Sequence, residues 1–396
     1  MHIGIMAPEF PPEVGGMCSY AVGIATELAR SDRVTVYTLE GRGDPALALE
    51  QKPILTRDLR TTSASLERET VDVWYTLNAG LAALAPRLDA PLATMFNGND
   101  FVNPWLVYRR WWLEPFTTGR WRRAARDLRR ALSRRDLDRA LRETRRVFAI
   151  SRASANLAAT IYPQHHPKMT IVPPGVDDFY FHAPLPESAG KHARDPIRIL
   201  TVARLEAWTR RKNVDGVLRA LPLLPPAVPV TYTVVGDGDD RARLERLAAE
   251  LGVADTVRFT GRIGRAALLD VYRESDVFVL AAQARPNDIE GFGIVYLEAA
   301  AMGVPALCSR AGGATDAVED GVTGLVLDSS SPQAIADGIV KFAHLRTTFD
   351  ARQVRAFAEE FRWSQIAATI RRELREIAAE PAVVPARAET APAGPR

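Results

Sequence analysis

Cysteine is scarce in this sequence, and long apolar runs are missing. Cys18 and Cys308 are the only cysteines among the 396 residues, too few for a disulfide framework or a cysteine metal cluster. No apolar run approaches the ~18 residues that a membrane-spanning helix needs. The chain begins directly with an apolar stretch at residues 2–6, so no signal peptide is visible. These absences favour a protein of the cytoplasm.

Charge is nearly balanced overall, but arginine is concentrated in one segment. The formal net charge is +3, with 47% hydrophobic and 25% charged residues, an ordinary composition for a soluble globular protein. Residues 101–146 hold fourteen arginines against five acidic residues, whereas the rest of the chain is acidic on balance. A chain of this length is expected to form two domains.

Strand-like and helical stretches alternate through the first half. Strands are expected at residues 2–6, 34–38, 71–75, 91–96, 147–151 and 170–172, and a helix at 19–30 follows a Pro- and Gly-rich loop. Such alternation predicts a parallel α/β sheet covered by helices on both faces.

A second set of strands starts after an expected linker at residues 183–196. These strands are expected at 197–203, 230–236, 257–259, 277–280, 305–308 and 324–327. The predicted division is a first domain at 1–185, a second at 190–358, a helical segment at 359–379 and a disordered tail at 380–396. Two doubly wound domains place a ligand cleft between the carboxyl ends of their strands.

The stretch from Glu290 to Gly303 carries the strongest functional signal. Gly291 and Gly293 permit close approach of a ligand to the backbone. The unpaired amides of the helix start that follows favour an anion, usually phosphate. Glu298, about two turns along that helix, is placed to reach another part of the same ligand. Structural glutamates in an ordinary amphipathic helix are the alternative.

This stretch resembles the donor-sugar motif of retaining glycosyltransferases of family four, which have the GT-B fold. The resemblance rests on Glu-Gly-Phe-Gly followed by Leu-Glu-Ala-x-Ala-x-Gly-x-Pro, with seven residues between Glu290 and Glu298. It implies two Rossmann-like domains that face each other across a cleft. It also implies sugar transfer from a nucleoside diphosphate sugar to an acceptor hydroxyl, with Glu290 on the donor sugar and Glu298 on the ribose.

Two cations follow the first strand of the second half. Arg204 and Lys212 match the Arg and Lys that this family uses to neutralise the departing diphosphate. The loop between them is slightly long, so Arg211 is an alternative to Lys212. Two solvated loop cations are the other interpretation. Opposite them, Gly15 and Gly16 match the family's Pro-Pro-x-x-Gly-Gly loop, which offers backbone amides to phosphate.

Asn97 marks a departure from the family pattern. Many members have His-Gly-x-Asp where this chain has Asn97-Gly98-Asn99-Asp100. Asn binds hydroxyls but does not titrate near neutral pH, so imidazole acid–base chemistry is excluded there. Asp100 either orients the acceptor hydroxyl or caps the next turn.

The resemblance implies a further set of donor-binding positions. The predicted catalytic residues are Glu290, Arg204, Lys212, Asn97 and Asp100, and the predicted donor-binding residues are Gly15, Gly16, Arg211, Gly236, Arg262, Ile263, Gly291, Phe292, Gly293, Ile294 and Glu298. Asp237-Gly238-Asp239 is interpreted as a turn and not as a metal site, and no histidine lies at metal-ligand spacing. No cofactor or metal is therefore expected.

The arginine-rich segment is expected to form amphipathic helices with a basic face. Leu128, Leu132, Leu137 and Leu141 recur at helical spacing among the arginines, and aromatic residues lie upstream at Trp105, Tyr108, Trp111, Trp112 and Trp121. A solvated helical pair that caps the first domain is one interpretation. The other is a contact with anionic lipid or a lipid-linked acceptor at the inner face of the membrane. No nucleic-acid motif accompanies the charge.

The resemblance therefore implies a retaining, metal-independent hexosyltransferase of GT-B fold that uses a UDP- or GDP-linked sugar, and we expect it to act in envelope glycan, glycolipid or natural-product glycoside synthesis. Two alternatives stay open. One is a nucleotide-sugar 2-epimerase of the same fold, which needs titratable groups in the cleft. The other is a non-catalytic binding protein that docks on membranes.

Overall fold

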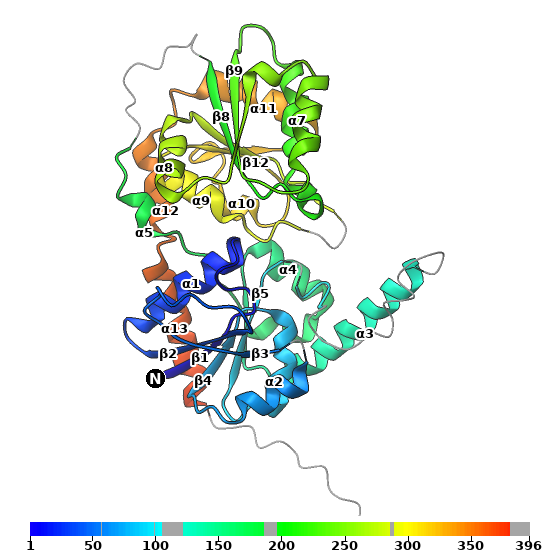
Figure 1. Ribbon diagram of the computed structural model, residues 1–396, viewed down its shortest axis with the longest axis vertical. Coiled ribbons are helices and arrows are strands. Elements are labelled where there is room, and N and C mark those ends of the chain that lie inside the picture. Colours follow the sequence, from blue (N-terminus) through cyan, green and yellow to red (C-terminus); the bar gives the residue numbers. More distant parts are fainter. Residues whose placement is uncertain (57, 99, 105–121, 186–195, 286–288, 381–396) are drawn as a thin grey trace, which may run out of the picture.

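The computed structural model describes residues 1–56, 58–98, 100–104, 122–185, 196–285 and 289–380. The chain forms two lobes, each built on one parallel sheet (Figure 1). Among the described residues, no helix is long and apolar enough to cross a bilayer.

The first lobe contains a seven-stranded parallel sheet in the order β3-β2-β1-β4-β5-β6-β7. Its strands are β1 (His2–Met6), β2 (Arg33–Leu39), β3 (Glu50–Leu55), β4 (Val73–Thr76), β5 (Leu92–Phe96), β6 (Arg146–Ala149) and β7 (Met169–Ile171). β1, β4, β5 and β6 are almost completely buried, as expected for strands covered on both faces. β3 is the one strand of this sheet that the sequence did not predict. It is polar, contains Pro53 and lies at the sheet edge, where Pro is tolerated.

Helices and short turns connect these strands. They are α1 (Gly16–Ala29), α2 (Leu59–Leu66), the 3₁₀ segment η1 (Ala79–Arg87), α3 (Arg122–Glu143), α4 (Arg152–Ile161), η4 (Pro163–Lys168) and α5 (Asp178–Phe181). α1 starts three residues earlier than the sequence predicted, at Gly16 itself. Because all strands of this sheet are parallel, their carboxyl ends lie at the same edge of the sheet.

The second lobe contains a six-stranded parallel sheet in the order β10-β9-β8-β11-β12-β13. Its strands are β8 (Ile197–Val202), β9 (Val230–Val235), β10 (Val257–Gly261), β11 (Val277–Leu280), β12 (Ala306–Ser309) and β13 (Gly324–Leu327). Its connections include η5 (Ala207–Lys212), α6 (Val214–Ala220), η6 (Leu221–Leu223), α7 (Arg241–Glu250), η7 (Ala254–Thr256), α8 (Arg265–Glu274), α9 (Ile294–Ala301), α10 (Ala314–Ala317) and α11 (Pro332–Leu345). All six predicted strands are present, with ends shifted by at most two residues. The predicted fold class, two doubly wound α/β lobes, is confirmed.

The last two helices join the lobes. α12 (Ala351–Glu359) packs against α9, and α13 (Trp363–Ala379) returns to the first lobe and lies against α1 (Figure 1). Trp363 meets the Tyr20 ring edge-on at 5.3 Å, and a Cβ on Gly23 would fall 2.2 Å from its indole. Arg371 and Arg375 both pair with the buried Asp32. The predicted tail at 381–396 and most of the predicted linker, 186–195, lie outside the described residues.

The arginine-rich segment forms one helix over its described part. α3 projects from the first lobe (Figure 1). Leu137 and Leu141 near its carboxyl end are buried in the lobe, whereas Leu128 is half exposed. Arg134 donates to the carbonyl of Val102 at 2.9 Å. The aromatic residues at positions 105–121 lie outside the described residues.

Each sheet has one switch point, where the chain connections that leave two neighbouring parallel strands run to opposite sides of the sheet. In the first sheet it lies between β1 and β4, and in the second between β8 and β11. Loops that leave the carboxyl ends at a switch point diverge and open a crevice for ligands. These two crevices hold the candidate site.

Candidate active site

Glu290 is buried between two cations. Its Oε2 lies 2.5 Å from Arg211 Nη1 and 2.7 Å from Lys212 Nζ, and the residue is 5% exposed. Burial raises the pKa of Glu290, but Lys212 and Arg211 outweigh it and lower the pKa below the usual value. Burial and the neighbouring Arg211 and Arg204 lower the pKa of Lys212. The carboxylate is therefore ionised and shared by both cations.

The cation loop, residues 204–213, is held by its own turn and by the neighbouring strand. Asn213 adopts a left-handed conformation with φ 62° and donates to the carbonyls of Ala281 and Ser330. The amide of Gln283 donates to the carbonyl of Arg211 at 2.7 Å. At the start of the loop, Thr209 and Glu206 form a reciprocal cap. Arg211 and Lys212 thus both face Glu290. The sequence treated Arg211 as an alternative to Lys212, but the structure places both cations at the site.

Arg204 lies across the cleft from the loop that follows β1. A Cβ on Gly15 would fall 3.6 Å from Arg204 Nη1, and a Cβ on Gly16 would meet nothing within 4 Å. The Arg204 guanidinium stacks on the ring of Trp208 at 4.6 Å, and Trp208 is 62% exposed. The predicted Gly15–Gly16 loop and the predicted cations therefore face each other.

Glycines bring the two lobes into backbone contact. A Cβ on Gly291 would fall 2.7 Å from the carbonyl oxygen of Asn97, and one on Gly98 would fall 3.1 Å from the Cα of Gly291. The backbone amide of Gly313 donates to the carbonyl of Glu290. A Cβ added to Gly313 would fall 2.7 Å from the Cβ of Ser151 in the first lobe. Gly291 is thus required by the docking of the lobes themselves.

The helix after the glycines begins as the sequence predicted. Gly293 has φ 90° and caps α9, which starts at Ile294, so its first amides lack acceptors within the helix. On the far side of α9, Glu298 accepts a hydrogen bond from Tyr272 at 3.0 Å, and burial raises its pKa. The side chain of Phe292 is 2% exposed and packs against Phe361, so it belongs to the core.

The side chains of Asn97 and Asp100 are engaged within the first lobe. Asn97 Nδ2 donates to the carbonyl of Leu77 at 2.6 Å, and its buried Oδ1 has no hydrogen-bond partner among the described residues. Asp100 accepts from the amides of Asn97 and Ala79, both at 2.8 Å. Burial raises the pKa of Asp100 to about 6, against the lowering effect of these amides. Asp100 therefore organises the turn after β5.

The remaining predicted residues lie around the second switch point. A Cβ on Gly236 would fall 1.8 Å from the carbonyl oxygen of Ala203, so glycine is required where the loops after β8 and β9 cross. Arg262 is exposed and Ile263 is partly buried beside it. Asp239 accepts from the amide of Ala207, which makes it part of a turn. The described residues contain no cluster of three or more potential metal ligands.

The comparisons with known proteins agree with this geometry. The family described as Glycosyl transferases group 1 matches residues 187–360, and Glycosyltransferase Family 4 matches residues 14–178. The GDP-mannose-dependent alpha-(1-6)-phosphatidylinositol monomannoside mannosyltransferase of Mycolicibacterium smegmatis is 30% identical over 361 residues, which cover 85% of this chain and 87% of that protein. This chain belongs to glycosyltransferase family four.

Other relatives and solved structures extend the comparison. The D-inositol 3-phosphate glycosyltransferase of Corynebacterium urealyticum is 34% identical over 190 residues, 45% of this chain and 43% of that protein. Sucrose-phosphate synthase from Thermosynechococcus elongatus superimposes with a TM-score of 0.74 at 18% identity, covering 95% and 98% of the chains. Anabaena HepE in complex with UDP and glucose gives 0.67 at 20% identity, covering 94% and 99%. At these identities the structures show the fold alone, and the fold is GT-B.

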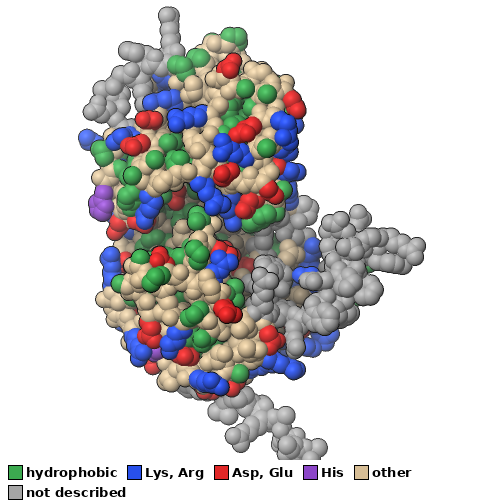
Figure 2. Space-filling view, in the orientation of Figure 1, with side chains coloured by type: hydrophobic (Ala, Val, Ile, Leu, Met, Phe, Trp, Pro, Cys, Tyr) green, Lys and Arg blue, Asp and Glu red, His purple; other side chains and the backbone are tan. Residues whose placement is uncertain are grey.

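The glycosyltransferase has further groups at the cleft that the motifs did not indicate. Glu9 follows β1, is exposed, and interacts electrostatically with Arg204. Asp316 of α10 accepts from the backbone and side chain of Arg152 at the start of α4. Figure 2 shows a hollow between the lobes, with lysine and arginine side chains near its upper border. Isolated acidic residues carry no sequence signal that would have identified either Glu9 or Asp316.

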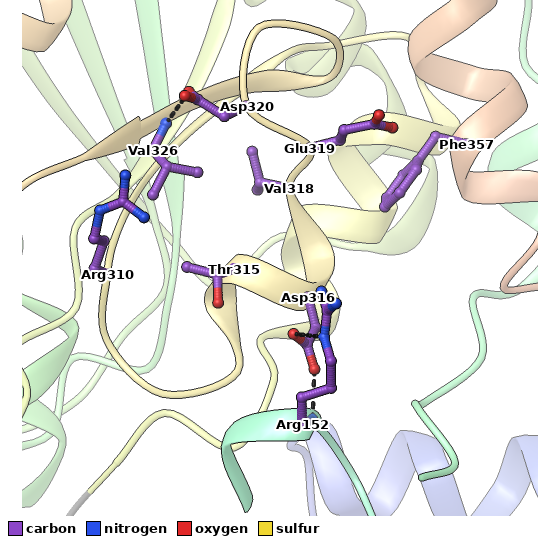
Figure 3. Close-up of a pocket in the computed structure, with 9 residues that line it drawn as sticks. All are labelled: Arg152, Arg310, Thr315, Asp316, Val318, Glu319, Asp320, Val326 and Phe357. Atoms are coloured by element: carbon purple, nitrogen blue, oxygen red, sulfur yellow. Dashed lines mark hydrogen bonds and ion pairs between the residues drawn. The ribbon is translucent and has the colours of Figure 1, made fainter. Parts of the chain in front are cut away.

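A cavity of about 400 Å³ adjoins the contact between Arg152 and Asp316. Figure 3 shows Asp316 pointing at Arg152, while Arg310, Glu319 and Phe357 surround the space. None of the predicted donor-binding or catalytic residues lines it.

Proposed function

We propose that this protein transfers a sugar, with retention of anomeric configuration, from a nucleoside diphosphate sugar to an acceptor hydroxyl. GDP-mannose is the first donor to test, because the mycobacterial relative that matches most of the chain is GDP-mannose-dependent. A UDP-linked sugar is the second. A lipid-linked polyol is the proposed acceptor class, because the same relative is named as a phosphatidylinositol monomannoside mannosyltransferase.

The observation that carries this proposal is Glu290 held between Arg211 and Lys212, beside the start of α9 and opposite Gly15 and Arg204. Three cations and two sets of backbone amides converge on one place, which suits a diphosphate. A diphosphate bound there would compete with Glu290 for Lys212 and Arg211. Glu290 would then be released to accept hydrogen bonds from hydroxyls of the donor sugar.

The chemical step follows from the same arrangement. The bond between the anomeric carbon and the diphosphate oxygen breaks, and the negative charge that develops on that oxygen is stabilised by Arg204, Lys212 and the α9 amides. The acceptor oxygen attacks from the same face, and its proton passes to the departing phosphate. The protein residues bind and orient both partners, and no metal is required for these steps.

Glu298 is proposed to bind the ribose. It lies on α9 beside Tyr272, and its carboxylate can accept from vicinal ribose hydroxyls. Glu298→Ala should weaken nucleotide binding strongly in calorimetry. Unchanged binding would remove Glu298 from the donor site.

The proposed donor class is tested by thermal shift against UDP-, GDP- and ADP-sugars, followed by a transfer assay with and without EDTA. A stabilising donor and EDTA-resistant transfer with retained configuration are expected. An isomerised sugar from donor alone would indicate an epimerase instead. Tight vesicle binding without transfer or hydrolysis of any donor would indicate a binding protein.

We also propose that α3 contacts an anionic membrane surface from the cytoplasmic side. Its described part is rich in arginine and projects from the first lobe (Figure 1), which leaves that charge accessible to lipid headgroups. Sedimentation with liposomes should show binding that requires anionic lipid. Equal binding to neutral liposomes would contradict the proposal.

A further inference from the structure

The crevice at the first switch point, between β1 and β4, contains three carboxylates that differ in their partners. Both oxygens of Asp100 accept backbone amides. Glu13 forms an ion pair with Arg42. Glu9 lies three positions after the end of β1, and among the residues that the structure describes its carboxylate has no hydrogen bond or ion pair. Glu9 is therefore the carboxylate of this crevice that remains available to a ligand.

Glu9 is connected electrostatically to the proposed diphosphate site. Burial raises the pKa of Glu9, Glu13 raises it further, and Arg204 and Arg42 lower it, so the exposed side chain lies among protein atoms within range of Arg204. Arg204 in turn acts on Lys212, which contacts Glu290. The loop after β1, which contains Glu9, also faces Arg204 directly, because a Cβ on Gly15 would fall 3.6 Å from Arg204 Nη1. Glu9 thus belongs to the first-lobe side of the proposed diphosphate site, and Glu290 with Lys212 belongs to the second-lobe side.

We propose that Glu9 recognises the acceptor, and that its carboxylate accepts hydrogen bonds from vicinal, uncharged hydroxyl groups of a ring polyol seated at the β1–β4 switch point. The proposal rests on the proposed sugar transfer. A carboxylate accepts two hydroxyl donors well, and parallel α/β sheets bind ligands at this position. Asp100, which the sequence offered for the same role, is occupied by backbone amides.

The Glu9 carboxylate also limits the charge of the acceptor ring on the face that meets Glu9. Glu9, Glu13 and Asp100 make this wall acidic, and Arg42 is already paired with Glu13. A phosphate on the ring face that meets Glu9 would be repelled. The acceptor ring is therefore expected to present hydroxyls there and to direct any phosphate or lipid away from β1.

The test compares Glu9→Gln, Glu9→Ala and Glu9→Asp with wild type, using GDP-mannose as donor and phosphatidylinositol monomannoside in mixed micelles as acceptor. Glu9→Ala should raise the acceptor KM about 10- to 100-fold, the loss expected for a hydrogen bond to a charged group. Glu9→Gln should have a smaller effect in the same direction, and Glu9→Asp should restore part of the affinity. Donor dissociation constants should stay within about twofold.

Glu67→Gln is the control, because Glu67 is an exposed carboxylate of the same lobe that follows α2 and precedes β4, at the edge of the sheet opposite the crevice. Acceptor KM should not change in this variant. Equal acceptor kinetics for wild type and all Glu9 variants would overturn the role of Glu9 while leaving the transferase intact. Absence of transfer by wild type to this acceptor and to methyl α-mannoside, from every nucleotide sugar tried, would overturn the proposed function and the acceptor role with it.

Charge at the acceptor seat is tested by inhibition. Myo-inositol and D-inositol 3-phosphate are compared as competitors of the acceptor for the wild type and for Glu9→Gln. The wild type should bind the phosphorylated ring more weakly than the neutral ring, and Glu9→Gln should reduce that difference. Tighter binding of D-inositol 3-phosphate to the wild type would contradict an uncharged acceptor face.

Discussion

Asp316 accepts two hydrogen bonds from Arg152, although the two residues belong to different lobes. Its Oδ2 lies 2.6 Å from the backbone nitrogen of Arg152 and its Oδ1 lies 2.9 Å from Arg152 Nε (Figure 3). Arg152 is the first residue of α4, so a carboxylate from the second lobe stabilises the positive end of a helix in the first. This contact lies beside the Gly313–Ser151 approach and favours the observed arrangement of the lobes.

Removing this carboxylate should loosen the lobes. Asp316→Ala should reduce stability by about 1 kcal/mol, the usual effect of losing a helix cap, and should increase the radius of gyration in small-angle scattering without donor. Glu319→Ala is the control, because Glu319 lines the same cavity and, within the described parts of the chain, forms no hydrogen bond or ion pair with the first lobe. An identical scattering curve for Asp316→Ala and wild type would show that other contacts hold the lobes.

Gly291→Ala should keep each lobe folded and impair their docking. The new Cβ would fall 2.7 Å from the carbonyl oxygen of Asn97, a backbone atom that moves only if the lobes separate. A displacement of about 1 Å at a reacting centre can cost about 100-fold in rate, so kcat should fall by up to that factor. Gly264→Ala, where a Cβ meets nothing within 4 Å, should behave as wild type. Normal turnover by Gly291→Ala would contradict the close-contact argument.

Glu290→Gln should lower both stability and activity. Without its charge, Arg211 and Lys212 repel each other, and loss of one partner of a buried pair costs about 3 kcal/mol or more. Because the pKa of Glu290 is lowered, its contribution to stability is present at neutral pH and is lost as the pH falls through the folded-state pKa. Unfolding followed by fluorescence from pH 3 to pH 7 should show a smaller pH dependence in the variant.

Nucleotide binding should partly rescue that variant. GDP would supply the negative charge that Arg211 and Lys212 lack, so GDP should raise the Tm of Glu290→Gln more than that of the wild type. An equal shift in both proteins would indicate that the diphosphate does not contact these cations.

Trp208→Ala should affect donor binding without affecting folding. Trp208 is 62% exposed, and its ring holds the Arg204 guanidinium at 4.6 Å. A cation–π contact at an exposed position contributes about 0.5–1 kcal/mol, so the donor KM should rise about two- to fivefold at unchanged Tm. Trp208→Phe should retain most of the affinity, and Leu223→Ala should have no effect, although Leu223 is also exposed. An unaltered donor KM in Trp208→Ala would show that Arg204 needs no support from the ring.

Asp100→Asn should change the pH dependence of stability. The pKa of Asp100 is raised from 3.8 to about 6, so the folded state holds the proton more tightly than the unfolded state. The wild type should therefore lose up to about 2–3 kcal/mol as the pH rises from about 4 to 6, and the variant should lack this loss. Urea unfolding at pH 4.5 and pH 7 measures the difference. A steeper loss of stability in Asp100→Asn would contradict the raised pKa.

Much of the fold was predictable because its signals are local. Strands buried on both faces must be apolar over four or more residues, and β11 at 277–280 and β13 at 324–327 were predicted with the observed bounds. β3 was missed because an edge strand needs no apolar run, and its Pro53 argues against a strand in the middle of a sheet. The Glu290 stretch and the Arg204–Lys212 pair were identified from motif spacing.

The geometry of the site depended on contacts that no local pattern contains. Glu290 and Lys212 are 78 positions apart, and they meet because β8 and β11 are neighbours whose carboxyl ends share one edge. The side-chain amide of Asn97 donates to the backbone carbonyl of Leu77, so the tertiary structure directs this group into the first lobe. Whether Gly291 served a ligand or the interface was decided by the approach of Asn97 from the other lobe.

The sequence by itself determined two parallel sheets, the family and the residues of the proposed diphosphate site, because apolar runs and motif spacings depend on neighbouring positions. Tertiary structure alone decided that both Arg211 and Lys212 bind Glu290, that Asp100 belongs to a turn and that Glu9 has no hydrogen-bond or ion-pair partner in the part of the chain that the structure describes. Which charges pair depends on distances across the fold, and these are set by strand order and by the docking of the lobes.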